Sequence, residues 1–380
     1  MTLQAAWAHE FFPPGPPEAA TPGLAAFAGT EALASVNRRL GGFFDGRLRD
    51  AATHGAEYAA LWTAARDATV GGKRLRPALV IGAWRHLGGE AGGESGALEN
   101  AVTVASAFEL LHTAFLLHDD VIDGDTVRRG RPNLQGAFAA RALERGVTVE
   151  DAADWGAAAG VLAGDLLLHA AQRMLAGIDV DRERREALLD LLDDSVFVTA
   201  AGELFDVGFG IGVAPATLGD VLGMTERKTA DYSFGSPLAA GAILSGATAD
   251  AGAALREFGR LVGTAFQLRD DLLGVFGVEA QTGKSTLTDL RRGTLTPLIA
   301  FARGTAQWPT IAGYLGRELG QQEVLLVRQA LEDCGARSFV EALIDDFSSR
   351  AIRVAGSPAL PATLGRHLVH VAGTAVERAA

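Results

Sequence analysis

Hydrophobic positions recur at helical spacing along almost the whole chain. Ala, Leu, Glu and Arg dominate, β-branched alternation is scarce, and Gly and Pro mark the breaks. Pro77 suits the first turn of a helix that ends near Gly88-Gly89, and a long apolar helix is expected from about Leu98 to Asp123. Pro237 is expected to break the chain between two later helices. The remaining long helices are predicted at about 152–177, 186–209, 216–231, 235–247 and 252–277, followed by shorter ones beyond a loop from about Thr282 to Gly293.

So many apolar helix faces require burial against one another, which predicts an all-α helical bundle. The interior holds no Pro/Gly/Ser-rich linker, so one domain is expected over residues 31–380. Residues 1–30 lack the pattern of a signal peptide and are expected to form a loosely ordered arm. No run approaches the roughly 20 apolar residues of a membrane span. Cys334 is the only cysteine, which fits a reducing compartment and predicts a cytoplasmic protein.

The charge pattern limits the classes of partner. A net charge of −12 argues against a nucleic-acid-binding protein. The basic residues nevertheless form two compact clusters, Lys73-Arg74-Leu75-Arg76 and Arg128-Arg129-Gly130-Arg131. Such clusters in an acidic chain are typical of focused anion sites, although a solvated basic face is the alternative for either one alone.

Two distant segments carry nearly the same pattern of apolar residues and paired aspartates. Residues 115–120 read Phe-Leu-Leu-His-Asp-Asp, and residues 266–271 read Phe-Gln-Leu-Arg-Asp-Asp. Paired carboxylates beside an apolar run are costly unless a cation compensates them. A shared polyvalent ligand, namely a diphosphate held by several divalent metal ions, would explain both pairs.

The first aspartate cluster has the spacing D-D-x-x-D. Asp119 and Asp123 are four residues apart and therefore share a helix face, while Asp120 lies about 100° around the helix. At a helix C-terminus the two carboxylates repel each other and meet the negative end of the helix dipole. Bound Mg²⁺ would resolve both problems. A solvated polar helix end is the alternative, and the basic residues Arg128 and Arg129 argue against it.

The second cluster contains fewer acids, since Gly274 stands four residues after Asp270. One metal ion bound by Asp270, with Asp271 in support, is expected. A polar segment with Lys284 and residues 289–293 follows, and could close over a metal-bound diphosphate.

Five motifs in this order resemble the trans-isoprenyl diphosphate synthases, from about residue 35 to the C-terminus. They are Gly71-Gly72-Lys73-Arg74-Leu75-Arg76-Pro77, Asp119–Asp123 with Arg128-Arg129-Gly130, Gly164-Asp165, Lys228-Thr229 and Phe266–Asp271. The resemblance implies a single α-helical bundle around a central cavity. It also implies a transferase that condenses an allylic diphosphate with isopentenyl diphosphate, head to tail, to give an all-trans prenyl diphosphate.

The resemblance assigns roles to individual residues. Asp119 and Asp123 would bind two Mg²⁺ ions and Asp270 a third, with Mn²⁺ able to substitute, and Asp120 would belong to the same catalytic motif. Thr229 and Gln267 would direct oxygen atoms towards the developing allylic cation. The diphosphate group of the allylic substrate would contact Arg128, Lys228 and Lys284. The diphosphate group of isopentenyl diphosphate would contact Lys73, Arg76, His112 and Arg129.

Product length should depend on the residues beneath the first aspartates. Phe115 lies one helical turn before Asp119, and its neighbour Ala114 is small. One bulky and one small residue predict an intermediate limit, with geranylgeranyl diphosphate as the product and farnesyl diphosphate as the runner-up. Ordinary core packing of Phe115 is the alternative. The resemblance also implies a homodimer.

Two departures from the family pattern leave other functions open. Gly274 replaces an acid, and Thr294 stands where the family usually has a lysine. A class I terpene cyclase would share the fold and the first motif, but it has no use for a second diphosphate site at Lys73, Arg76 and His112. A non-catalytic subunit of a heteromeric prenyl synthase is the third reading.

Overall fold

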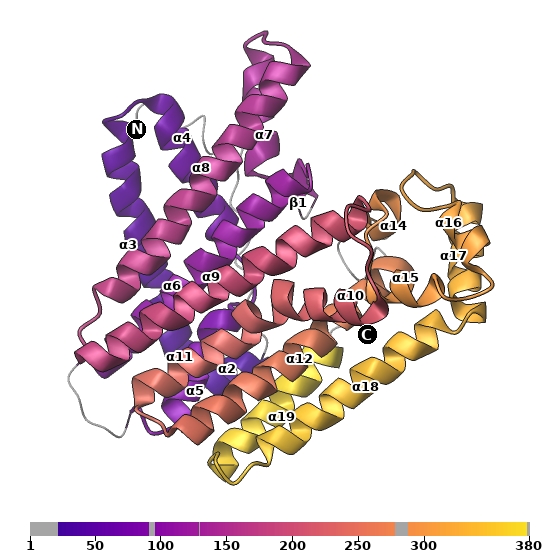
Figure 1. The fold of residues 1–380 in the computed structure, drawn as a ribbon. Coiled ribbons are helices and arrows are strands. Elements are labelled where there is room, and N and C mark those ends of the chain that lie inside the picture. The colour runs from indigo at the N-terminus through magenta and orange to yellow at the C-terminus, as the bar shows by residue number, and fades with distance from the viewer. Residues whose placement is uncertain (1–21, 91–95, 129, 278–287, 378–380) are drawn as a thin grey trace. The chain divides into compact units, whose positions relative to one another are not determined.

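The computed structural model describes residues 22–90, 96–128, 130–277 and 288–377, and they are almost entirely helical (Figure 1). The all-α class expected from the periodicity is confirmed. The chain divides into two compact units. Unit 1 consists of residues 1–189 and 243–246, and unit 2 of residues 190–242 and 247–380. Two helices are shared between the units: α9 (Arg182–Gly210) and α11 (Ser236–Ser245).

Unit 1 is built around the long apolar helix α6. Two short antiparallel strands, β1 (Val127–Arg128) and β2 (Arg131–Pro132), come after α6 in the chain. The helices of this unit are α2 (Pro22–Ala28), α3 (Thr30–Ala52), α4 (Ala56–Thr69), α5 (Leu75–His86), α6 (Ala97–Ile122), α7 (Leu134–Glu144) and α8 (Val149–Ala176).

Helix α6 packs against α3, α5 and α8. It is long and apolar enough to cross a membrane by length and composition, contrary to the expectation that no run approaches that length. However, 78% of the apolar window is buried within the protein, so α6 serves as a core helix. Glycines at four-residue spacing on α8 allow its close approach: a Cβ at Gly160 would overlap Val121, and one at Gly164 would overlap His118.

The ordered part of unit 1 begins earlier than the sequence suggested. Residues 1–30 were expected to form a loose arm, but residues 22–28 form α2, whose Phe27 is fully buried. The Phe27 ring stacks on His86 at 5.5 Å between centroids, and Gly82 leaves the space that this ring occupies. Burial of this aromatic side chain stabilises the short helix. Residues 1–21 lie outside the described residues.

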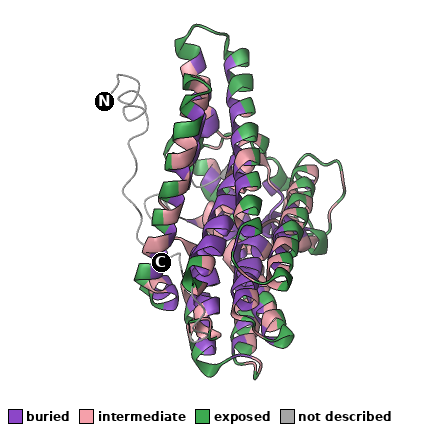
Figure 2. Ribbon diagram, turned by 90° about the vertical axis from the view of Figure 1, so that its left-hand side faces the viewer, coloured by how far each residue is buried: buried purple, intermediate pink, exposed green. Residues whose placement is uncertain are grey.

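Unit 2 is organised around helix α12, which packs against η1, α18 and α19. Many helices of the described chain have one buried and one exposed face, as the purple and green sides in Figure 2 show. The helices of this unit are α10 (Leu218–Thr225), the π-helix η1 (Glu226–Gly235), α12 (Ala249–Phe276), α14 (Thr288–Arg292), α15 (Pro297–Ala302), α16 (Trp308–Ala312), α17 (Gln321–Asp333), α18 (Ala336–Ala355) and α19 (Ala362–Glu377).

The break expected at Pro237 is wrong. Helix α10 continues directly into η1, and η1 into α11, so Pro237 lies in the first turn of α11. The fixed φ of proline, near −65°, is compatible with the helical backbone at this position. At this junction the backbone N–H of Ser236 donates to the carbonyl of Asp231, five residues earlier, in the hydrogen-bond pattern of a π-helix.

Candidate active site

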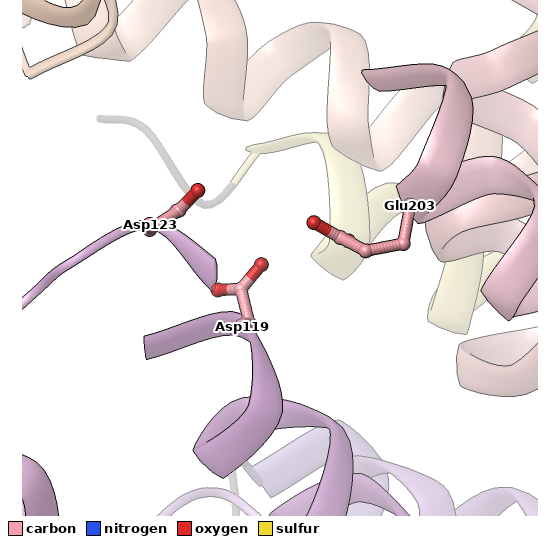
Figure 3. A group of neighbouring side chains, drawn as sticks. All are labelled: Asp119, Asp123 and Glu203. Atoms are coloured by element: carbon pink, nitrogen blue, oxygen red, sulfur yellow. The ribbon is translucent and has the colours of Figure 1, made fainter. Parts of the chain in front are cut away.

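The first aspartate motif forms the C-terminal turn of α6. The backbone N–H of Asp123 donates to the carbonyl of Asp119 at 2.8 Å, so both side chains leave the same face of the helix. Their carboxylate oxygens lie within 4.8 Å of one another (Figure 3). Glu203, which Figure 3 also labels, belongs to unit 2. Two hard oxygen donors at the negative end of a helix dipole suit a divalent cation such as Mg²⁺.

The middle aspartate of the motif has a different environment. Asp120 is buried, and the Arg128 guanidinium donates to its Oδ1 from Nη2 at 2.6 Å and from Nε at 2.9 Å. The same guanidinium reaches Asp119 at 3.4 Å. Burial raises the pKa of Asp120, and the hydrogen bonds from Arg128 oppose that shift. Asp120 therefore holds Arg128 beside the exposed end of the motif.

The residues expected to bind the second diphosphate lie at the start of α5 and on α6. Lys73, Arg76 and His112 are all half-buried. Gly71 and Gly72 have φ values of +90° and +77°, which only glycine adopts readily, so the turn before α5 is tightly curved. The N-terminus of a helix favours anions through its free N–H groups. Arg129 lies outside the described residues.

The two residues expected to limit product length differ in burial. Ala114 is completely buried, whereas Phe115 is only half-buried on the turn of α6 that precedes Asp119. The ring of Phe115 is therefore not enclosed in the core of unit 1.

The second aspartate pair lies near the end of α12, in unit 2. Asp271 is buried and accepts a hydrogen bond at 2.9 Å from Nε2 of Gln267, one turn earlier on the helix. Burial, followed by the nearby charge of Asp289, raises the pKa of Asp271 well above its usual range. Asp270 is half-buried and adds to that shift. This surplus of negative charge would be relieved by a bound cation.

The structure shows what occupies the place of the acid missing at position 274. The Oδ2 atom of Asp289, on α14, lies 2.9 Å from the position that a Cβ on Gly274 would take. The absence of a side chain at Gly274 therefore lets a carboxylate from a later helix approach α12. The sequence contained this aspartate, but nothing in the order of residues indicated its contact with Gly274.

Lys228 is held by two carboxylates that the sequence had not indicated. On η1, its Nζ lies 2.6 Å from Asp206 and 3.0 Å from Glu203, both on α9. Gly202 permits this contact, since a Cβ there would overlap the backbone of Lys228. The available signal was a pair of acids three residues apart on one predicted helix. Thr229 lies beside Lys228 and is half-buried.

Lys284 and Thr294 are the two remaining positions that the sequence singled out. Lys284 lies outside the described residues. Thr294, which stands where a lysine is usual, donates its backbone N–H to the carbonyl of Asp289 at 2.9 Å.

An all-α fold in which carboxylate pairs end apolar helices, with basic side chains beside them, is typical of enzymes that bind diphosphates through divalent metal ions. Comparison with known proteins identifies the family. Residues 59–332 match the model of the polyprenyl synthetase family. The chain is 32% identical over 275 residues to the geranylgeranyl diphosphate synthase of Methanosarcina mazei, covering 72% of this chain and 76% of that protein. It is 33% identical over 278 residues to the (2E,6E)-farnesyl diphosphate synthase of Mycobacterium tuberculosis, covering 71% and 70%.

A solved structure agrees with these relatives. The geranylgeranyl pyrophosphate synthase of Corynebacterium glutamicum, complexed with isoprenyl diphosphate and magnesium, superposes with a TM-score of 0.82 at 28% identity, covering 90% of this chain and 97% of that one. The chain belongs to the polyprenyl synthetase family and is a trans-prenyl diphosphate synthase, a transferase of a Mg²⁺-dependent family.

Proposed function

We propose that this enzyme adds isopentenyl diphosphate to allylic diphosphates and releases geranylgeranyl diphosphate. The observation that carries the prenyl-transfer assignment is the C-terminal turn of α6, where the carboxylates of Asp119 and Asp123 lie within 4.8 Å beside Arg128. The family match supports the reaction, and the names of the relatives differ in product length.

Three Mg²⁺ ions are proposed, two at Asp119 and Asp123 and one at Asp270, with Mn²⁺ as a substitute. The neighbouring carboxylates of half-buried Asp119 and exposed Asp123, and the raised pKa of Asp271 beside Asp270, support a need for cations in both places. Bound metal would supply positive charge to the leaving diphosphate. Arg128 and Lys228 would add hydrogen-bond donors to the same group, and Lys284 is assigned with them from the sequence.

The protein's own side chains would then stabilise the allylic cation. The side-chain nitrogen of Gln267 donates to Asp271. This hydrogen bond orients the amide so that the side-chain oxygen of Gln267 can face positive charge. Thr229 would contribute a second oxygen. The double bond of isopentenyl diphosphate, held by Lys73, Arg76, His112 and Arg129, attacks the cation. The departing pyrophosphate would accept the proton that is lost next.

Geranylgeranyl diphosphate is proposed because one bulky and one small residue lie a turn before Asp119. Phe115 is a half-buried bulky residue that would meet the end of a growing chain, while Ala114 beside it is small and buried. Farnesyl diphosphate is the alternative product.

A homodimer is also proposed, in the cytoplasm. Phe197 and Leu204 are seven residues apart on α9, and Ile211, seven residues further on, directly follows its last residue. Their side chains are 77%, 73% and 72% exposed in the single chain. Apolar side chains repeated along one face of a helix are typical of a protein interface. Light scattering of the purified enzyme and of Leu204→Lys tests this, because a monomeric wild-type protein would contradict it.

The main experiment incubates the purified chain with isopentenyl diphosphate, Mg²⁺ and each of the C5, C10 and C15 allylic diphosphates, with product length measured by mass spectrometry. A C20 all-trans diphosphate that is lost on adding chelator supports the proposal. A C15 end product supports farnesyl diphosphate synthase. A cyclic hydrocarbon would instead indicate a terpene cyclase, and no product from any pair would favour a non-catalytic subunit.

A further inference from the structure

One arginine of the first basic cluster has an unusual backbone conformation. Among the described residues, Arg74 is the only non-glycine residue with a positive φ, at φ 51° and ψ 40°. This left-handed conformation is unfavourable for L-residues because Cβ crowds the neighbouring carbonyl. It occurs immediately before α5, and the carbonyl of Arg74 accepts the helical hydrogen bond of Ala78 at 3.0 Å. Strained residues persist where the surrounding structure holds them firmly.

The Arg74 side chain supplies that support. Its Nη1 donates to Glu109 Oε1 at 2.6 Å and to the carbonyl of Thr69 at 2.9 Å, and its Nε donates to Asn37 Oδ1 at 2.8 Å. These partners belong to α6, to the last residue of α4 and to α3. The rigid fork of a guanidinium presents donors on separate nitrogens at fixed positions, whereas a lysine has a single nitrogen on a flexible stem.

The ion pair is buried, with side-chain exposures of 10% for Arg74 and 8% for Glu109. Arg74 therefore points into unit 1, and its polar atoms are directed to protein partners. Within the cluster, Lys73 before it and Arg76 after it are the two residues proposed to contact the anion, and both are half-buried.

Glu109 connects this turn to the other part of the proposed isopentenyl diphosphate site. It lies three residues before His112 on α6, and side chains at that spacing are neighbours on a helix face. The Arg74–Glu109 pair thus joins the turn that carries Lys73 and Arg76 to the face that carries His112.

We propose that Arg74 and Glu109 are positioning residues that set the spacing of Lys73, Arg76 and His112 for the diphosphate of isopentenyl diphosphate. Neither residue would touch the substrate. The inference rests on the proposed function, because it assumes that these three side chains bind isopentenyl diphosphate.

The test measures steady-state kinetics of the full-length enzyme with Mg²⁺, varying each substrate while the other is saturating. Glu109→Gln keeps the shape of the side chain and removes its charge. It is expected to raise KM for isopentenyl diphosphate about tenfold or more, since small misplacements of binding groups have effects of this size. KM for the allylic substrate should remain nearly unchanged. Arg74→Lys keeps the charge without the fork and should raise KM for isopentenyl diphosphate in the same way. Arg74→Gly relieves the strained φ but removes the side-chain contacts, so it should also raise this KM.

Two further variants make the result interpretable. Glu57→Gln removes the charge that pairs Glu57 with Arg141 and Arg145 elsewhere in unit 1 and should leave both KM values unchanged. Lys73→Ala tests the site itself. If Lys73→Ala raises KM for isopentenyl diphosphate but Glu109→Gln and Arg74→Lys do not, the positioning role is overturned while the proposed site stands. If all three leave KM unchanged, the proposed site is wrong as well.

Loss of folding is separated from loss of positioning by a binding measurement. Glu109→Asp retains the charge, and calorimetry with isopentenyl diphosphate alone needs no turnover. Weaker binding by a folded variant supports the proposal. Equal increases in both KM values, or a lower melting temperature with unchanged binding, would show a purely structural role and overturn it.

Discussion

Gly263→Ala should separate two helices that carry proposed active-site residues. Gly263 lies on α12, where an added Cβ would be 2.6 Å from Cα and 2.7 Å from Cβ of Ala230 on η1. Ordinary contacts begin at 3.4 Å, so the helices would have to part by about 0.8 Å. The obstructing atoms are backbone and Cβ atoms, which no rotation of a side chain can move away. Ala230 directly follows Lys228 and Thr229, so the same shift would displace both residues.

The expected energy follows from two opposing effects. Replacing glycine by alanine within a helix contributes about 1 kcal/mol of stability. Overpacking a tight contact costs about 1–3 kcal/mol, and here it should lie at the upper end because the backbone is involved. Gly263→Ala is therefore expected to lower the free energy of unfolding by about 1–2 kcal/mol.

Gly252→Ala is the matched control on the same helix, because nothing lies within 4 Å of its Cβ position. It should be neutral or stabilise by up to about 1 kcal/mol. Urea unfolding followed by circular dichroism gives the free energy of each variant, and prenyl-transfer kinetics report the effect on the allylic substrate. A Gly263→Ala protein as stable and active as Gly252→Ala would refute the close packing of α12 on η1.

Three further predictions concern the proposed active site. Phe115→Ala should lengthen the product by at least one isoprene unit, measured by mass spectrometry, whereas Phe347→Ala, another half-buried phenylalanine, should leave it unchanged. Folding raises the pKa of Asp271 above its usual value of 3.8. At pH values above that, the folded metal-free protein therefore binds more protons than the unfolded chain. Its free energy of unfolding should therefore fall as pH rises from there through the raised pKa. Urea unfolding across pH in chelator should show this slope in the wild type and a flatter one in Asp271→Asn. Asp289→Asn should weaken Mg²⁺ binding about tenfold in calorimetry, as the loss of a supporting carboxylate often does. Adding Gly274→Asp to this variant should then recover part of the affinity. No recovery would show that the carboxylate of Asp289 does not take the place of an acid at position 274.

Much of the fold followed from local pattern. The long apolar helix expected at Leu98–Asp123 is α6 (Ala97–Ile122), and the helix expected at 252–277 is α12 (Ala249–Phe276). Helical periodicity is a property of neighbouring residues, so it can be recognised without knowledge of packing. Pro237 was misjudged because a π-helical junction depends on hydrogen bonds five residues apart, which leave no clear mark in composition.

The site shows where local pattern stops being sufficient. The basic run Lys73-Arg74-Leu75-Arg76 indicates an anion site, but its order cannot show that Arg74 turns inward to Glu109, 35 residues away. Likewise the sequence shows Gly274 as a missing acid, and only the folded chain brings Asp289 to that position.

The sequence by itself indicated the helical class, the two aspartate pairs and the proposed chemistry of metal-bound diphosphates, because residue type and spacing along a helix decide which charges share a face. Tertiary structure alone decided which partners hold those charges. Asp120 with Arg128 and Lys228 with Asp206 and Glu203 are contacts set by how helices pack. Packing depends on the shapes of both surfaces, including the glycines that let backbones approach, and no single segment contains that information.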